Sequence, residues 1–264
     1  MIKKLPKPPL TEVVFEMRWK MLTNDTIPFP YDPSYPQLLD TFSKYAAAKG
    51  FVDQEDTQAP YSILALQIAR RFQQKDSKSF PLLQIGPGLY AANESVNYDW
   101  DAFKKMAIDG ASVIESSFPK LDAFGFNLDR LELRYIDTFD EDLIGTADLL
   151  DFMNKATTAS VSIPELVGKD RLKSKYRGRI FFEADAKKPS GSVLSIDLIS
   201  AARKKSGSAV IRMTTKVFSR EDTVFPKSSK RWSQKLDDWL EDAHHLTSTS
   251  FRRFVRPEVY EKFQ

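Results

Sequence analysis

The chain contains only two histidines, and they are adjacent, at His244 and His245. Imidazole is the side chain best suited to acid–base catalysis near neutral pH, so these residues are the first catalytic candidates. Neighbouring positions on a helix point about 100° apart, so the two rings cannot chelate one ion together. His245 shares a helical face with Asp238, Glu241 and Asp242, which forms a weak metal or acid–base cluster. We favour a solvated polar face for His245 and a hydrogen-bonded border position for His244, and we assign no metal site.

Two extended segments place a glutamate two residues before an arginine. They are Glu16 with Arg18 and Glu132 with Arg134, and an aromatic residue follows each arginine. Residues two apart on a strand share a face, so each pair can form a structural ion pair on a sheet. A planar guanidinium can instead bind a phosphate or carboxylate in a bidentate way, which makes Arg18, Arg134 and Tyr135 candidate ligand-binding residues. We favour the ion pair, and the repetition of the motif keeps the ligand site as an alternative.

A third cluster of charged residues is basic. Residues 169–179 carry six positive charges and one negative charge. Clusters of this kind contact phosphates in nucleic-acid-binding proteins, although solvated loop charge is their commoner origin. The candidate nucleic-acid-binding residues are Lys173, Lys175, Arg177 and Arg179.

Several classes of chemistry are excluded by what the sequence lacks. The chain has no cysteine, so it has no disulfide, no thiolate metal site and no cysteine nucleophile. Its glycines form neither a phosphate loop nor a dinucleotide fingerprint, and the motifs of serine hydrolases and zinc proteases are missing. The sequence therefore implies no cofactor, and we lean toward a protein that is not an enzyme.

The composition is that of a folded protein. Its 264 residues suffice for one large core or two modest domains, and 42% hydrophobic with 28% charged residues argue against disorder. The formal net charge of +3 permits contact with nucleic acid without requiring it. Prolines interrupt the N-terminal residues and no apolar run follows, so we expect no signal peptide, no membrane segment and a cytoplasmic location.

Strand and helix patterns alternate along the chain. Strands are expected over residues 11–20, 61–73, 80–85 with a continuation at 89–93, 127–139, 176–184, 193–201 and 209–218, and helices over 35–48, 100–117, 146–155 and 230–254. Each half reads as a strand, a helix, further strands and a long helix. We predict a pseudo-duplicated α+β fold with halves 1–125 and 126–264 and two long helices on a mainly antiparallel sheet, in a TBP-like or helix-grip-like arrangement. The alternative is a single irregular α+β domain.

Short motifs spread over nearly the whole chain carry a family resemblance. They are residues 8–18 (PPLTEVVFEMR), 82–85 with Asn93, Tyr98 with Trp100, 133–136 (LRYI), and 242–244 with Phe251. Together they resemble a sporadically distributed family of bacterial proteins of about this length, with an N-terminal PPLxEVVFExR motif and a central LRY motif. The resemblance implies carriage on mobile DNA, where genes of defence systems are common. Asp137 departs from the family pattern, which has a small or amide residue there.

These observations lead to one leading functional hypothesis and two alternatives. The leading hypothesis is a non-enzymatic binding or assembly protein, an accessory of a bacterial antiviral defence system, that contacts nucleic acid, a nucleotide or a partner protein. The first alternative is a metal-dependent enzyme acting on phosphate esters with His244 or His245, nearby carboxylates and Arg134. The second is a structural homo-oligomer without a ligand.

Overall fold

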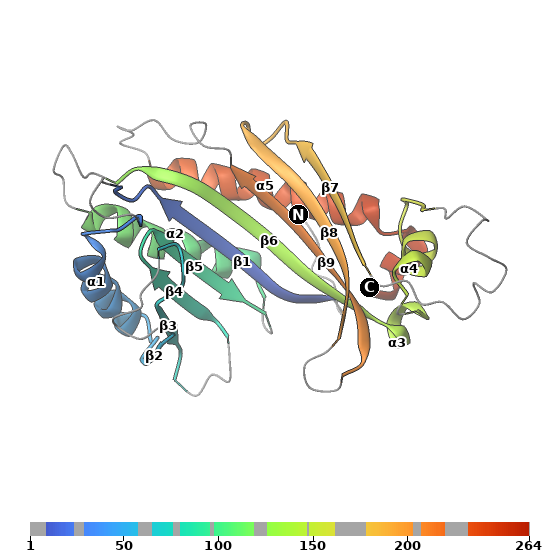
Figure 1. Cartoon of the computed structure of the whole chain (residues 1–264), viewed down its shortest axis with the longest axis horizontal. Helices are drawn as coiled ribbons and strands as arrows, with labels where there is room; N and C mark the ends of the chain where they lie inside the picture. The colour runs from blue at the N-terminus through green and yellow to red at the C-terminus, as the bar shows by residue number, and fades with distance from the viewer. Residues whose placement is uncertain are drawn as a thin grey trace.

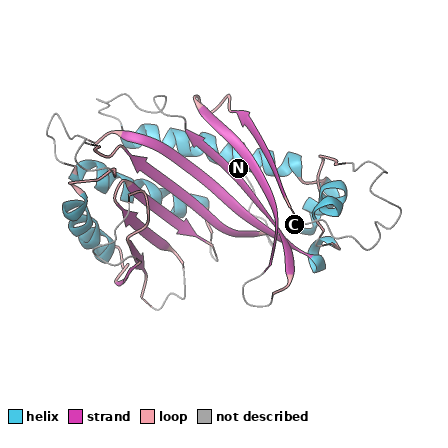
Figure 2. Ribbon diagram, in the orientation of Figure 1, coloured by secondary structure: helices cyan, strands magenta, loops and turns pink. Residues whose placement is uncertain are grey.

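The computed structural model describes residues 9–23, 29–57, 65–75, 80–95, 98–118, 126–146, 148–161, 178–202, 207–219 and 232–263. These residues form one nine-stranded antiparallel sheet with helices packed on one of its faces (Figure 1, Figure 2). The predicted α+β class and the predicted antiparallel sheet are therefore confirmed.

The strands are β1 (Leu10–Trp19), β2 (Asp53–Asp56), β3 (Arg70–Gln73), β4 (Leu82–Gly86), β5 (Leu89–Glu94), β6 (Leu128–Asp140), β7 (Arg179–Asp185), β8 (Ser192–Ala202) and β9 (Ala209–Ser219). The helices are α1 (Tyr35–Ala48), α2 (Trp100–Ser117), α3 (Glu141–Ile144), α4 (Leu149–Ala156), α5 (Trp232–Phe254) and α6 (Pro257–Tyr260), and a 3-10 helix follows at Glu261–Phe263. The strand order in the sheet is β2-β3-β4-β5-β1-β6-β9-β8-β7.

The two strands that carry the Glu–Arg motifs, β1 and β6, lie side by side at the centre of the sheet. On one side of this pair the sheet continues through the other strands of the first half, and on the other side through those of the second half (Figure 1). The antiparallel register sets Glu16 opposite Glu132 and Arg18 opposite Arg130. Two motifs that are far apart in the sequence therefore meet at the seam between the halves.

Side chains of β1 alternate between two environments. Val13, Phe15, Met17 and Trp19 are buried in a core that also contains the apolar stripes of α1, α2 and α5. A second apolar cluster joins α4 and α6 to the far end of β6, β8 and β9 on the same side of the sheet. We call the opposite side the open face, because no described helix packs on it (Figure 1). Charged residues of β1 lie on the open face, as a period of two requires.

Helix α2 has the bounds that its apolar periodicity predicts, and local contacts explain them. Asp99 caps its N-terminus by accepting a hydrogen bond from the backbone N–H of Ala102 at 3.0 Å. Gly110 lets the helix approach the sheet closely, because a Cβ there would lie 2.2 Å from the hydroxyl oxygen of Tyr90. This anchoring fixes the start of α2, where Tyr98 and Trp100 lie.

Among the differences between the expected elements and the structure, three concern strands of the first half. The strand expected over 61–73 begins only at Arg70, because residues 65–67 form a turn and a bend, while residues 61–64 lie outside the described part. Strand β2 was not expected, since its sequence DQED shows no apolar alternation and is fully exposed. The strand expected over 80–85 was expected either to end or to bulge at residues 86–88 and then to continue over 89–93. It ends at Gly86, and residues 89–94 turn back as β5 of a hairpin, with Gly88 at a φ of +73°.

Candidate functional site

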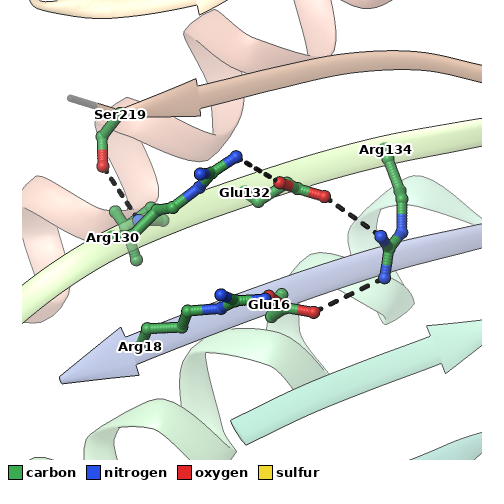
Figure 3. A network of polar contacts seen from close by, with 7 residues as sticks. Glu16, Arg18, Arg130, Glu132, Arg134 and Ser219 are labelled. Carbon is green, nitrogen blue, oxygen red and sulfur yellow. Dashed lines mark hydrogen bonds and ion pairs between the residues drawn. The ribbon is translucent and has the colours of Figure 1, made fainter. Parts of the chain in front are cut away.

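An ion-pair network crosses the β1–β6 seam on the open face (Figure 3). Glu16 Oε1 accepts a hydrogen bond from Arg18 Nε at 2.7 Å, and Glu132 Oε2 lies 2.8 Å from Arg130 Nη2. Arg134 joins the two pairs, with Nη1 3.2 Å from Glu132 Oε1 and Nη2 3.5 Å from Glu16 Oε2. Each carboxylate is thus shared between two guanidinium groups. Residues from both halves of the chain form one connected network.

The register explains why this network needs arginine. Glu16 and Glu132 face each other directly, and like charges at opposed positions of a sheet repel. Their side chains are only 10% and 7% exposed, so water screens the repulsion between the two carboxylates only weakly. Arg134 supplies the positive charge between them and remains 33% exposed. The geometry is that of structural ion pairs whose cations also reach the surface.

Strand β9 extends the positive charge of the open face. Lys216 lies opposite Arg134 in the register, and its Nζ is 5.1 Å from the centroid of the Phe218 ring. The guanidinium of Arg130 lies 4.2 Å from the same centroid. Within the described ranges, neither Lys216 nor Arg212 has a carboxylate at salt-bridge distance. We call the set Arg18, Arg130, Arg134, Arg212 and Lys216 the cationic row.

The helix-covered face holds a different polar group, a hydrogen-bonded chain of two tyrosines and a histidine. The hydroxyl oxygens of Tyr98 and Tyr135 are 2.7 Å apart, and Tyr135 Oη is 2.6 Å from His244 Nδ1. The Trp100 ring stacks on the imidazole, with centroids 4.0 Å apart and an interplanar angle of 13°. Motifs at residues 98–100, 133–136 and 242–244 thus converge. They connect the start of α2, the centre of β6 and the middle of α5.

Burial sets the protonation of this chain. It lowers the pKa of His244 to about 4, although the nearby Glu241 carboxylate acts in the opposite direction. Burial raises the pKa of Tyr98 and of Tyr135, so both phenols keep their protons. Every member is satisfied when Tyr98 donates to Tyr135 and Tyr135 donates to Nδ1 of neutral His244. A histidine with so low a pKa is a weak base at neutral pH, so the chain serves packing better than proton transfer.

Two acidic residues of α5, Asp237 and Glu241, are engaged with residues of α2. Glu241 accepts a hydrogen bond from Trp100 Nε1 at 3.1 Å and pairs with Lys104, whose Nζ also lies 2.9 Å from Asp237. His245 is exposed on the outer side of α5. The described residues contain no group of three or more His, Asp or Glu side chains that could hold a metal ion.

The structure separates residues that the enzyme hypothesis combined. Arg134 lies on the open face, whereas Tyr135 and His244 lie on the helix-covered face, because successive residues of a strand point in opposite directions. Lys173, Lys175 and Arg177 lie outside the described residues. Their neighbour Arg179 begins β7, where Nε and Nη2 contact the two Asp197 carboxylate oxygens at 2.7 and 2.8 Å.

Three members of the cationic row, Arg130, Arg212 and Lys216, were not recognised from sequence. Arg130 stands two residues before Glu132, which is the same spacing that singled out Arg134. That spacing could have identified it. Lys216 carries no such local signal, because only the pairing of β9 with β6 brings it beside Arg134.

Two further observations bear on what the chain is. None of the described helices is both long enough and apolar enough to cross a membrane. Comparison with protein-family models, with curated proteins and with solved structures finds no match to this chain. Of the short motifs, those at residues 8–18, 98–100, 133–136 and 242–244 contribute residues to the ion-pair network or to the tyrosine–histidine chain.

Replacing Tyr135 with phenylalanine tests the tyrosine–histidine chain. The change removes one hydroxyl and leaves both the Tyr98 hydroxyl and His244 Nδ1 without a partner. We expect the free energy of unfolding at pH 7 to fall by about 2 kcal/mol in urea titrations, since each orphaned buried group costs about 1–3 kcal/mol. Tyr45→Phe is the matched control, because its hydroxyl forms no hydrogen bond with any described residue. Equal stability of the two variants would show that the tyrosine–histidine chain contributes nothing to the free energy of unfolding.

Proposed function

We propose that this protein is a non-enzymatic binding protein that holds a nucleic-acid strand on the open face of its sheet, across β1, β6 and β9. The observation that supports this proposal is the cationic row. Three of its arginines, Arg18, Arg130 and Arg134, are held in place by carboxylates on one side and are about one-third exposed on the other. Its two cations on β9 have no carboxylate at salt-bridge distance in the described part of the chain.

The arrangement of the row favours a polymer over a small anion. Adjacent strands are about 4.8 Å apart and alternate residues of a strand about 6.7 Å apart, so charges on three neighbouring strands form an extended array. Such an array matches a chain of phosphates better than a single phosphate, which needs donors that converge on one point. The ion pairs with Glu16 and Glu132 also restrict the guanidinium groups before binding, which reduces the entropy lost on association.

Fluorescence anisotropy with labelled single-stranded DNA and RNA oligonucleotides tests this proposal. Arg212→Gln combined with Lys216→Gln removes two charges without breaking an ion pair of the network. We expect at least roughly tenfold weaker binding at about 50 mM salt. We also expect the slope of log affinity against log salt to become less negative by about 1.4.

A second pair of substitutions separates local contact from net charge. Lys44→Gln with Lys155→Gln removes the same charge from exposed positions on α1 and α4. Equal loss of binding in both double variants would contradict a site on the open face. Loss only on neutralising Lys173, Lys175, Arg177 and Arg179 would assign binding to that basic segment instead. Wild-type protein that binds neither oligonucleotide would end the proposal.

We also propose a role in bacterial defence and a duplicated origin of the two halves, and each has its own support. The defence role follows from the family resemblance of residues 8–18 and 133–136 alone. A duplicated origin of the two halves is supported by the sheet order. Outward from the seam, β1-β5-β4-β3 and β6-β9-β8-β7 each place the first strand of a half beside its last strand and then run back through the sequence, and β2 adds a fifth strand to the first half. In each half, a helix follows the first strand and a long helix follows the last.

A further inference from the structure

Strand β7 ends the sheet on the side of the second half. Its residues are mostly exposed, and they include two large aromatic side chains, Phe181 at 49% and Phe182 at 38% exposure. Among the described residues, only β8 pairs with it. Edge strands present backbone groups that can pair with another strand, so exposed aromatic residues there mark a contact surface.

Hydrogen bonds at the two ends of β7 show which backbone groups point outward. The Gly178 carbonyl accepts a hydrogen bond from the Ser200 N–H, and the Ala186 N–H donates to the Ser192 carbonyl. The backbone hydrogen bonds to β8 are therefore made by the even-numbered residues. Along an antiparallel strand, the N–H and C=O groups of successive residues point alternately to one side of the strand and to the other. The N–H and C=O groups of the odd-numbered residues therefore face away from β8. They belong to Arg179, Phe181, Glu183 and Asp185.

The sequence of β7, RIFFEAD, is complementary to itself in the antiparallel direction. When two copies pair about Phe182, all seven residues of each strand are matched. Arg179 then lies opposite Asp185 of the other copy, and Phe182 lies opposite Phe182. The outward-facing odd residues form the hydrogen-bonded pairs in this register. Phe182 falls at a non-hydrogen-bonded position, where opposed side chains are closest.

We propose that a second copy of this chain docks on β7, so that two sheets join edge to edge into one continuous antiparallel sheet. In each copy the ring centroids of Phe182 and Phe254 of α5 are 5.8 Å apart. Four aromatic rings therefore lie together around the two-fold axis, on the helix-covered side of the joined sheet. Opposed residues of an antiparallel pair point to the same face, so the two open faces lie on the same side of the joined sheet. This dimer does not depend on nucleic-acid binding.

The other edge of the sheet shows what a protected edge looks like in this protein. Strand β2 is also exposed, but its sequence is DQED. Two antiparallel copies of β2 would bring Glu55 opposite Glu55 and would contain no positive charge from either strand. Like charges directly opposite are destabilising. Self-pairing is therefore opposed at β2 and favoured at β7, where Arg179 of each copy falls opposite Asp185 of the other.

The dimer is tested by sedimentation velocity over a range of protein concentrations. The wild-type chain is expected to shift to twice the monomer mass as concentration rises. Glu183→Pro removes an outward N–H and leaves the pairing with β8 intact, so we expect its dimer dissociation constant to rise at least roughly tenfold. Gln54→Pro is the matched control at the β2 edge, because Thr57 donates to Ala69 and so the Gln54 N–H also points outward.

A single introduced cysteine tests the register, because the chain has no native cysteine. Phe182→Cys places two sulfurs opposite each other on the two-fold axis, so mild oxidation is expected to give a disulfide-linked dimer. Phe181→Cys is not expected to cross-link, since Phe181 lies opposite Glu183. Unchanged circular dichroism of each variant confirms that it folds. A monomer at every concentration, equal dimerisation of Glu183→Pro, or cross-linking of the Phe181→Cys variant in place of the Phe182→Cys variant would overturn the proposal.

Discussion

Replacing Asp137 with asparagine is expected to raise the free energy of unfolding at pH 8 by roughly 3 to 4 kcal/mol and to leave it nearly unchanged at pH 4. Asp137 is 5% exposed and lies opposite Met213 on the helix-covered face of β6. No hydrogen bond to its carboxyl group comes from the described residues. Burial raises its pKa from 3.8 to about 7. Each unit by which the pKa differs between the folded and unfolded states corresponds to about 1.4 kcal/mol, which sets the size of the expected effect.

The direction in which the free energy of unfolding changes with pH follows from proton binding by Asp137. Between about pH 4 and pH 7 the folded protein holds a proton on Asp137 that the unfolded chain has released. Stability from this group is therefore fully present below pH 4 and falls as pH rises to about 7. Asparagine cannot ionise, so the variant lacks this fall.

Urea titrations at several pH values between 4 and 8 measure the difference between wild type and Asp137→Asn. His244 contributes an opposite slope, because its lowered pKa makes the folded state lose stability as pH falls from 6.5 toward 4. That contribution is common to both proteins and cancels in the difference. Asp101→Asn, at an exposed position on α2, is the control for the loss of one negative charge. A pH-independent difference for Asp137→Asn would contradict a buried, protonated carboxyl group.

Replacing Arg134 with methionine is expected to lower the free energy of unfolding at pH 7 by about 2 to 3 kcal/mol. The change leaves Glu16 and Glu132 opposed across the seam without the cation that joins them. Breaking a buried ion pair costs about 3–5 kcal/mol, and the partial exposure of Arg134 reduces that figure. Arg212→Met on the same face is the control, with an expected change within about 0.5 kcal/mol.

A double-mutant cycle shows whether repulsion is the cause. Adding Glu132→Gln to Arg134→Met removes one of the two facing charges, so most of the lost stability should return. Independent additive effects of the two substitutions would mean that the carboxylates do not repel across the seam. Because Arg134 has this structural role, Arg212 and Lys216 are the better positions for testing nucleic-acid binding.

Several local features could be read from the sequence because they depend on nearby residues only. The bounds of α1 and α2 match the helical spacing of their apolar residues. The period of two in the strand expected over 11–20 predicts that Glu16 and Arg18 share a face, and the structure places both opposite the buried Val13 and Phe15. The Glu–Arg spacing likewise identified the pairs Glu16–Arg18 and Glu132–Arg134.

Tertiary structure decided what those faces meet. Glu16 and Arg134 are 118 residues apart in sequence, and no local pattern sets the register that brings them together. The same pairing adds Lys216 to the open face and moves His244 to the opposite side of the sheet from Arg134. The period of a strand determines which side a residue takes, whereas its neighbours depend on how whole strands and helices bury their apolar faces. The charged strands were visible in the sequence, and the network that they form is a product of the fold.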